Sequence, residues 1–466
     1  MKVCIISEGS YPVVKGGLSE WAHELIKELN YVNFDVFCIA PPGRKKPLYD
    51  KLPNVEHLYI SEISQSDKSE KSPDLPKSVS GELSTYLRAV LYGEPLNCEK
   101  LADLFKGYHI TKNWLRSKDF WYSTVQFYRE NSPERDFSDF FWTTQGIYSM
   151  LINALTLAEQ LPKADVYHSL TSGLGGLLGS MAKLEHGSHL VVAELGQYLR
   201  ERALELSRYK VREAEAQQIM KFSKTMLKTS FQYADLIVPV SKSYIAPELE
   251  LGASPDKIRI VTNGINSDKF IPPSSSKNGA APVVGCFARV VPIKGQETFI
   301  KACKKVLERQ QATFVIVGEV QDDEYYGQCQ RLVHELDVAK NIKFVGYAKD
   351  LLEWYHKVDV FVLPSLWEGI PLALLEAMSC GLPCVCSEVG GVPDILSGTG
   401  AGYTVPPSEP DILASRICEL LENENLRKAM GTRARELVKS KYTLRETAHR
   451  ILGVYLEVLL NGSAVR

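Results

Sequence analysis

Residues Leu363–Gly391 read LPSLWEGIPLALLEAMSCGLPCVCSEVGG and predict a strand, a turn, a helix and a second strand in close succession. The apolar run Asp359–Leu363 is typical of a buried strand. Pro371 suits the first position of a helix, and Gly381 suits its end, because glycine adopts the left-handed backbone found there. Cys384–Ser387 follows as a second buried strand. Such alternation predicts an α/β fold with a parallel sheet.

The start of this helix is a candidate anion-binding site. Backbone N–H groups near Gly369 and Ile370 would lie at the carboxyl end of a strand, where phosphates bind well. Glu368 precedes the helix and Glu376 lies inside it, about 8 Å or more away at roughly 1.5 Å per residue. Carboxylates accept hydrogen bonds, so both suit hydroxyls. The pattern favours a nucleotide sugar; the alternative is a loop charge and a solvated helix residue.

Two cations follow a strand predicted at Val283–Phe287. Arg289 and Lys294 flank a loop before the next helix. Arginine binds two phosphate oxygens at once and lysine acts as a point charge, so the pair suits a pyrophosphate. The alternative is that both are solvated surface charges.

A glycine pair follows the first predicted strand, Lys2–Ser7. Gly16 and Gly17 precede a helix predicted at about Leu18–Leu29. Glycine permits close backbone approach, which suits a phosphate or an acceptor group at a helix start. The spacing matches neither the dinucleotide fingerprint nor a P-loop, and a tight turn is the alternative.

The chain is long enough for two domains, because 466 residues exceed the usual size of a single core. Pro272–Pro282 (PPSSSKNGAAP) is the clearest compositional break and predicts a flexible connector. We therefore predict domains over residues 1–271 and 283–442. Further strands are predicted at Asp35–Ala40, Ala164–His168, Ser188–Glu194, Asp235–Ser241, Ile258–Ile265, Thr313–Val317 and Ile342–Val345, and helices from Asp411 onward.

Two stretches of the first domain differ from this alternation. Ser61–Ser80 is rich in Ser, Lys and Pro and predicts a mobile loop. Leu83–Leu161 reads as mainly helical and carries Trp114, Trp121 and Trp142. We expect an inserted helical subdomain that packs its own aromatic core. An aromatic platform for an acceptor sugar is the alternative.

Composition disfavours several functions. A net charge of −2 gives no basic footprint for nucleic acid or an anionic membrane. No apolar run is long enough to span a bilayer and no signal peptide pattern is present, so a cytoplasmic location is expected. Cys380, Cys384 and Cys386 lie close together but have no histidine nearby, and cysteines in apolar runs read as buried hydrophobes. We therefore expect no metal site.

The two glutamates are separated by seven intervening residues in WEGIPLALLEAMSCGLPCV, residues 367–385. This stretch resembles the signature of the large retaining glycosyltransferase family that includes sucrose and glycogen synthases. The resemblance implies the GT-B arrangement, an α/β fold with two Rossmann-like domains facing a cleft and, here, a helical insertion in the first. It also implies that a helix within residues 443–466 crosses back to the first domain.

The family resemblance implies roles for the candidate residues of the second domain. Glu368 would contact the donor sugar and Glu376 the ribose. Arg289 and Lys294, in the motif RVVPIKG, would neutralise the leaving diphosphate.

The same resemblance covers two further strand ends. Gly346 and Tyr347 follow a strand at the place where the family holds the nucleotide base, largely through backbone groups. His168, in YHSLTSGLGG, matches a histidine that contacts the donor sugar in the family. Taken alone, it would read as a satisfied buried histidine.

A narrower resemblance concerns the first domain. The run LGQYLRER after the strand Ser188–Glu194, and the opening EGSYPVVKGGLSEWAHELI, resemble the cytosolic glycosyltransferases of the Pel exopolysaccharide system. The resemblance places Glu194, Tyr198 and Arg200 on the acceptor side. Leu195 stands where those enzymes have a histidine. A solvated helix face is the alternative for Arg200.

Together these features predict a retaining glycosyltransferase that moves a hexose from a nucleoside diphosphate sugar, most simply a UDP-sugar, to a hydroxyl of a glycan or other acceptor. No cofactor, metal or covalent nucleophile is expected. A membrane-bound synthase partner is left open. The alternatives are a nucleotide-sugar epimerase, a phosphorylase, or a non-catalytic subunit that binds nucleotide sugar.

Overall fold

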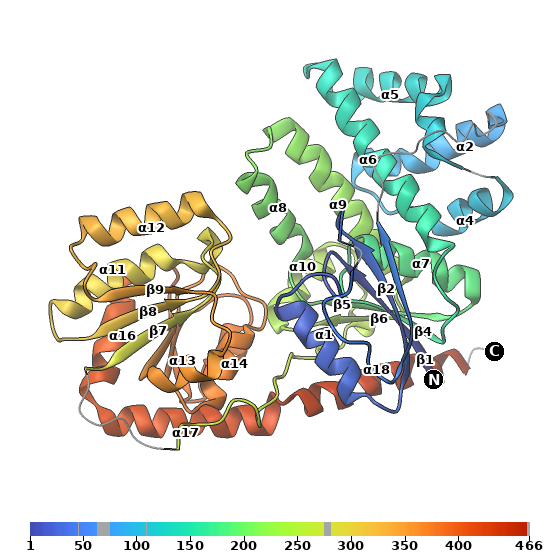
Figure 1. The fold of residues 1–466 in the computed structure, drawn as a ribbon. Helices are drawn as coiled ribbons and strands as arrows, with labels where there is room; N and C mark the ends of the chain where they lie inside the picture. The colour runs from blue at the N-terminus through green and yellow to red at the C-terminus, as the bar shows by residue number, and fades with distance from the viewer. Residues whose placement is uncertain (45, 63–74, 109, 275–280, 464–466) are drawn as a thin grey trace. The chain divides into compact units, whose positions relative to one another are not determined.

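The structure is a computed structural model that describes the chain except for residues 45, 63–74, 109, 275–280 and 464–466 (Figure 1). It divides into two compact units. Unit 1 comprises Met1–Pro239, Tyr244–Ile260 and Arg450–Arg466, and unit 2 comprises Val240–Ser243 and Val261–His449. Each unit has its own parallel β-sheet and is described by itself.

Within the described residues, unit 1 is built on a six-stranded parallel sheet with the order β3-β2-β1-β4-β5-β6. Strand β1 pairs with β2 on one side and with β4 on the other, so the strand order reverses there. Ligands of such sheets bind beyond the carboxyl ends of the strands near the reversal. The strands are β1 (Lys2–Glu8), β2 (Asn33–Ala40), β3 (Val55–Glu62), β4 (Val166–Ser169), β5 (His189–Glu194) and β6 (Leu236–Pro239).

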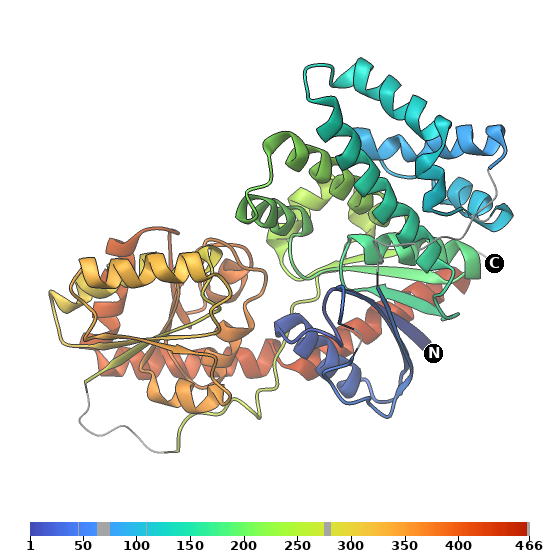
Figure 2. The same cartoon turned by 45° about the horizontal axis from the view of Figure 1, so that its top comes forward.

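Helices lie on either side of this sheet (Figure 2). Most of β1 and all of β4 are buried, and the interior of β1 is continuously apolar, as expected for a strand that is covered on both faces. The helices are α1 (Gly17–Glu28), α7 (Leu174–His186), α8 (Tyr198–Arg208), α9 (Glu213–Tyr233), α10 (Ile245–Glu250), the 3-10 helix η3 (Pro255–Lys257), and α18 (Leu444–Ser463) from Arg450 onward.

The predicted helical insertion is confirmed, but the prediction that it packs a core of its own is wrong. Its helices are α2 (Lys77–Leu87), α3 (Ala89–Tyr92), α4 (Cys98–Gly107), η1 (Lys112–Arg116), α5 (Lys118–Asn131) and α6 (Phe137–Ala158). They share one hydrophobic core with α7 and α9. Trp114 is buried in that core, where its Nε1 donates to Ser80 Oγ at 2.8 Å. Trp121 and Trp142 are exposed, so a sugar platform on this surface stays a prediction.

The described part of unit 2 holds a second six-stranded parallel sheet, with the order β12-β11-β10-β7-β8-β9. Its strands are β7 (Val283–Phe287), β8 (Thr313–Val317), β9 (Ile342–Gly346), β10 (Val360–Leu363), β11 (Cys384–Ser387) and β12 (Gly402–Val405). Its helices are η2 (Lys242–Tyr244), η4 (Pro292–Lys294), α11 (Gln296–Leu307), α12 (Asp323–Glu335), α13 (Leu351–Lys357), α14 (Leu372–Ser379), α15 (Val392–Leu396), α16 (Pro410–Glu422) and α17 (Glu424–Lys441). The carboxyl ends of β7 and β10 carry most of the predicted site residues.

The strand predicted at Ile258–Ile265 is wrong. Ile258 forms a single bridge with Ile237, and Ile265 forms one with Thr443. The segment passes from unit 1 to unit 2 after Ile260. Its two ends therefore pair with different units, and no continuous strand forms.

The loop predicted at Ser61–Ser80 is wrong at both ends and otherwise lies outside the described residues. Ser61 is in β3, an edge strand whose polar sequence VEHLYISE hid it, and Lys77 begins α2. The short edge strand β12 was also not predicted. The connector predicted at Pro272–Pro282 falls partly outside the described residues.

No helix in the described residues combines the length and the apolar character that crossing a membrane requires. All ten cysteines are buried and free, which agrees with their reading as small buried hydrophobes.

Candidate functional site

Lys294 and Glu368, which lie in separate motifs of the sequence, form an ion pair in unit 2. Lys294 Nζ lies 2.7 Å from Glu368 Oε1. The hydroxyl of Ser365 donates to the same oxygen at 2.6 Å. Only 7% of Glu368 is exposed. The carboxylate is therefore held in one position by a charge and a hydroxyl.

Gly295 lets the loop that carries Lys294 reach the loop that carries Glu368. Its φ is 67°, a conformation that favours glycine. A Cβ here would lie 2.1 Å from the carbonyl oxygen of Pro364, in the loop after β10. Because β7 and β10 are neighbours in the sheet, the two loops start side by side at its carboxyl edge.

The start of α14 is shaped by a second glycine contact. A Cβ on Gly390 would lie 1.6 Å from the carbonyl oxygen of Glu368, so only glycine fits there. The N–H of Gly391 donates to the carbonyl of Gly369 at 2.9 Å. Pro371 is the N-cap residue and not the first helical residue, so the helix begins one residue later than predicted. This contact fixes the turn that contains Glu368 and Gly369.

The N–H groups at this turn are available to a ligand. Neither Gly369 nor Ile370 donates a backbone hydrogen bond to another described residue. They precede the N-terminus of α14, where the helix dipole is positive. A negatively charged group placed here would gain hydrogen bonds and favourable electrostatics.

Arg289 lies at the same sheet edge but does not contact Lys294 or Glu368 directly. Its Nη1 donates to Gln321 Oε1 at 2.7 Å, and its carbonyl accepts from Gln296 Nε2 at 2.8 Å. The residue is exposed. The guanidinium is therefore oriented by Gln321 while remaining accessible to solvent.

The residues predicted for the nucleoside lie inside α14, which contains Glu376, and at the end of β9 in unit 2. Tyr355 donates to Glu376 Oε2 at 2.8 Å and stacks on Phe287 with ring centroids 4.3 Å apart. Burial and the Glu376 carboxylate raise the pKa of Tyr355, so its hydroxyl stays a donor. Gly346 ends β9 with a φ of 78°, and Tyr347 after it is exposed.

His168 is buried in unit 1. Its Nδ1 lies 2.7 Å from the hydroxyl of Tyr455 on α18, and none of the ring is exposed. Nε2 has no hydrogen-bond partner in the described part of the chain. Burial lowers the pKa of His168 to about 4, so the ring is neutral at physiological pH. Its contact with a donor sugar stays a prediction.

Gly16 and Gly17 are exposed at the start of α1. Gly16 is the N-cap residue, and its carbonyl accepts from the N–H of Glu20 at 2.9 Å. A Cβ on Gly16 would meet no atom within 4 Å. Packing within the chain therefore gives no reason for this glycine, which leaves both a ligand contact and a tight turn open.

The acceptor-side residues gather at the end of β5. Glu194 Oε1 accepts from the backbone N–H of Tyr198 at 2.9 Å, at the start of α8. Arg202, one turn further on, donates to the Tyr198 hydroxyl at 3.1 Å. Arg200 points to an exposed face of the helix. The structure thus brings Glu194 and Tyr198 together, and Arg200 is exposed on the same helix as Tyr198.

Several residues around these sites were not predicted from the sequence. Ser365 and Tyr355 orient the two glutamates of unit 2, and Glu248 lies near Glu194 in unit 1. Ser365 lies inside the stretch Leu363–Gly391, where its position three residues before Glu368 was the available signal. Tyr355 and Glu248 lie on short helices that carry no recognisable motif.

A metal is not indicated by the predicted site residues. Among the described residues, the His, Cys, Asp and Glu side chains close enough to share an ion are Asp35, Glu56 and His57. Lys2 Nζ lies 2.9 Å from carboxylate oxygens of both Asp35 and Glu56. The lysine ammonium therefore already occupies the position that a cation would take.

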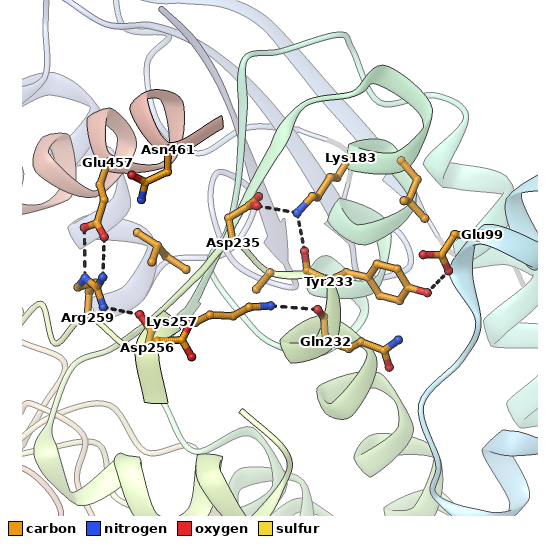
Figure 3. Close-up of a pocket in the computed structure, with 13 residues that line it drawn as sticks. Glu99, Lys183, Gln232, Tyr233, Asp235, Asp256, Lys257, Arg259, Glu457 and Asn461 are labelled. Carbon is orange, nitrogen blue, oxygen red and sulfur yellow. Dashed lines mark hydrogen bonds and ion pairs between the residues drawn. The ribbon is translucent and has the colours of Figure 1, made fainter. Parts of the chain in front are cut away.

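A polar pocket of about 510 Å³ lies in unit 1, near the amino end of β6 (Figure 3). Its cations already have partners. Lys183 lies 2.8 Å from Asp235, Arg259 Nη2 lies 2.6 Å from Glu457, and Lys257 donates to the carbonyl of Gln232 at 3.2 Å. None of the predicted site residues lines it, and it lies at the sheet edge opposite to the usual one for ligands.

Two family models match the chain. Residues 1–256 match the model described as "Domain of unknown function (DUF3492)". Residues 267–437 match "Glycosyl transferases group 1". The second match contains Arg289, Lys294, Glu368 and Glu376, so the residues of the unit 2 site all lie within it.

Curated relatives match through about half of the chain. A UDP-Gal:alpha-D-GlcNAc-diphosphoundecaprenol alpha-1,3-galactosyltransferase of Escherichia coli is 27% identical over 226 residues, which cover 46% of this chain and 57% of the relative. The amylovoran biosynthesis glycosyltransferase AmsK of Erwinia amylovora is 28% identical over 239 residues, covering 49% and 58%. The chain spans less than two thirds of the length of these relatives.

Solved structures match over nearly the whole chain. A sucrose-phosphate synthase from Thermosynechococcus elongatus has a TM-score of 0.66 at 18% identity and covers 99% of both chains. Anabaena HepE in complex with UDP-glucose has a TM-score of 0.62 at 15% identity, covering 98% of this chain and 100% of that one. The predicted GT-B fold of two Rossmann-like domains is thereby confirmed.

Proposed function

This chain belongs to the family described as a domain of unknown function (DUF3492), and because it joins that domain to a glycosyl transferases group 1 domain, we propose that it is a glycosyltransferase. We propose that it transfers a hexose from a nucleoside diphosphate sugar to a hydroxyl of a glycan, with retention of configuration. The observation that carries the proposal is the ion pair between Lys294 Nζ and Glu368 Oε1, at 2.7 Å, together with the backbone N–H groups of Gly369 and Ile370, which donate no backbone hydrogen bond to another described residue.

The arrangement supplies what departure of a diphosphate requires. Lys294, the exposed guanidinium of Arg289 and the positive end of α14 provide fixed positive potential where negative charge develops. Glu368 is better suited to accept hydrogen bonds from sugar hydroxyls, because a carboxylate would repel the diphosphate. In this proposal no metal or other cofactor takes part, and no residue acts as a covalent nucleophile.

We propose UDP as the nucleotide. Anabaena HepE is a structural neighbour in complex with UDP-glucose, and the Escherichia coli relative uses UDP-Gal. Glu376, oriented by Tyr355, is suited to the ribose hydroxyls. The backbone around Gly346 and Tyr347 is suited to the base. A relative from Corynebacterium glutamicum depends on GDP-mannose, so the donor screen includes that nucleotide sugar.

We further place the reaction in polysaccharide synthesis in the cytoplasm. AmsK acts in amylovoran biosynthesis, and a relative from Salmonella typhimurium is a putative colanic acid biosynthesis glycosyltransferase. The resemblance of the region around Glu194 to the Pel glycosyltransferases points the same way. A membrane-bound synthase that receives or supplies the glycan is part of this proposal.

The test combines donor binding with product analysis. Calorimetry with UDP-glucose, UDP-galactose, their N-acetyl forms and GDP-mannose should identify one donor class, and Lys294→Ala should reduce sugar transfer about 1000-fold while the protein stays folded. Lys301→Ala, an exposed lysine on α11, is the matched control and should keep full activity. A nearly active Lys294→Ala would refute the proposed role. An isomerised donor, or phosphate-dependent glycoside cleavage, would identify an epimerase or a phosphorylase instead.

A further inference from the structure

Two glutamates of unit 1 bury their carboxyl groups at the carboxyl edge of the sheet. Glu194 is the last residue of β5, and Glu248 lies on α10, which follows β6. Strands β5 and β6 are neighbours, so both residues lie at the same edge. Glu194 is 4% exposed and Glu248 is 3% exposed. The two are close enough for the charge of Glu194 to raise the pKa of Glu248.

These carboxyl groups lack the partners that buried acids normally have. Glu194 Oε2 and both carboxyl oxygens of Glu248 have no hydrogen-bond partner in the described residues. The buried hydroxyl of Ser172 also has none, although it lies close enough to Glu194 to lower the pKa of that carboxyl. Buried polar groups are nearly always paired, so an unpaired cluster points to a group that the chain itself does not supply.

No cation of the described chain compensates the pair. Glu194 and Glu248 take part in no ion pair among the described residues, and the nearby Glu201 adds negative charge that raises the pKa of Glu194. Arg202 on α8 is bound to Glu205 at 2.9 Å and to the Tyr198 hydroxyl at 3.1 Å. The local field is therefore negative whenever both carboxyl groups are ionised.

The protonation of the pair decides which ligand it suits. Burial raises the pKa of Glu194 to about 7 and that of Glu248 to about 8. Near neutral pH the two groups together keep at least part of their protons, so they both donate and accept hydrogen bonds. A hydroxyl group also does both. A carboxylate or phosphate would instead meet unscreened negative charge in a buried place.

We propose that Glu194, Glu248 and Ser172 form a subsite for the uncharged, hydroxyl-bearing end of the acceptor, and that Glu248, once ionised, makes the subsite reject acidic sugars. This inference rests on the proposed function, because it assigns the acceptor class of that reaction. The inference predicts that the part of the acceptor that binds to these three residues of unit 1 is a neutral sugar or a polyol. Glu248 thereby becomes a specificity-determining residue.

The test uses two sugars that differ only at C6, glucose and glucuronic acid. Saturation-transfer difference NMR of the full chain at pH 9, where both carboxyl groups are ionised, measures the contact of each sugar with the protein in the presence of saturating UDP. Glucose should give a signal about tenfold stronger than glucuronate, because like charges disfavour the acid. Glu248→Gln keeps the size of the side chain and removes its charge. It should bring the two signals to within about threefold of each other.

Glu250→Gln is the matched control, because Glu250 is exposed on the same helix as Glu248. This variant should keep the wild-type preference for glucose. Equal signals for the two sugars on the wild-type protein, no signal from either, or an unchanged preference in Glu248→Gln would each overturn the proposed subsite. Calorimetry with the UDP-sugars in the same samples reports the donor site separately. If the wild-type protein binds none of the UDP-sugars, the proposed function is refuted. If it binds a UDP-sugar but does not select glucose over glucuronate, only the subsite is refuted.

Discussion

Replacing Lys294 by methionine should destabilise the ligand-free protein. The substitution keeps the length of the side chain but leaves the Glu368 carboxylate, which is only 7% exposed, without its cation. Losing one partner of a buried ion pair costs about 3–5 kcal/mol, and leaving a buried polar group unpaired costs about 1–3 kcal/mol. Ser365 would still donate to the carboxylate and Lys294 is itself only partly buried. We therefore expect a loss of about 2 kcal/mol in the free energy of unfolding.

A double-mutant cycle isolates the contribution of the pair. In Glu368→Gln the charge is absent, so a further Lys294→Met change should cost little. We expect an interaction energy of about 1–2 kcal/mol between the two positions. For a unit of this size, a loss of about 2 kcal/mol lowers the Tm by roughly 4–8 °C. Lys301→Met on α11 controls for removal of a surface lysine.

The assay is urea and thermal unfolding followed by circular dichroism at pH 7.5 without nucleotide. The single variants, the double variant and the control are compared under identical conditions. A Tm of Lys294→Met within about 1 °C of the wild-type Tm would refute the reasoning, because such a change is well below the expected shift of roughly 4–8 °C. Strictly additive losses in the double variant would also refute it, because the two side chains would then act independently.

Three further predictions concern other positions. Gly295→Ala should destabilise unit 2 by more than about 2 kcal/mol, because a Cβ there would lie 2.1 Å from the carbonyl oxygen of Pro364. Gly398 has a φ of 73° and open space around it, so Gly398→Ala should cost only the backbone strain of about 1–2 kcal/mol. Glu248→Gln should be more stable than the wild type at pH 9 and should lose that advantage toward pH 5. Burial raises the pKa of Glu248 in the folded protein to about 8, so the wild-type protein loses stability as the pH rises through this value. A constant difference in stability across this pH range would contradict the reasoning. Trp114→Ala should lower the free energy of unfolding by about 3–5 kcal/mol because Trp114 is buried, whereas Trp142→Ala should leave it within about 0.5 kcal/mol because Trp142 is 63% exposed. If Trp142→Ala loses sugar transfer while donor hydrolysis continues, a sugar platform at Trp142 is supported. Unchanged transfer would remove that alternative.

The fold and the unit 2 site were predictable because their signals are local. A strand, a glycine turn and a helix follow one another within Leu363–Gly391, and each boundary has its own residue type. Lys294 and Glu368 could be placed at the same sheet edge because each follows a buried strand. Their direct contact was not predictable, since it depends on which strands are neighbours and on the space that Gly295 leaves.

The errors arose where structure depends on distant partners. The apolar run Ile258–Ile265 has the composition of a strand, but its two ends pair with Ile237 and Thr443 in different units. The edge strand Val55–Glu62 has a neighbour on one side only, so its sequence is too polar to stand out. The burial of His168 by Tyr455 joins positions 287 residues apart, a distance over which sequence patterns carry no information.

The two units differ in how their polar groups are satisfied before any ligand binds, and this difference has a measurable consequence. In unit 2 the carboxylate of Glu368 is already paired with Lys294, so removing either partner should lower stability as well as activity. In unit 1, Glu194 Oε2 and both carboxyl oxygens of Glu248 lack partners among the described residues, so their burial costs free energy that a ligand would recover. Neutralising Glu248 should therefore raise stability at alkaline pH while it reduces acceptor selection. Opposite signs of the Tm change, with a functional loss at both positions, would distinguish a preorganised donor site from a subsite completed by its ligand.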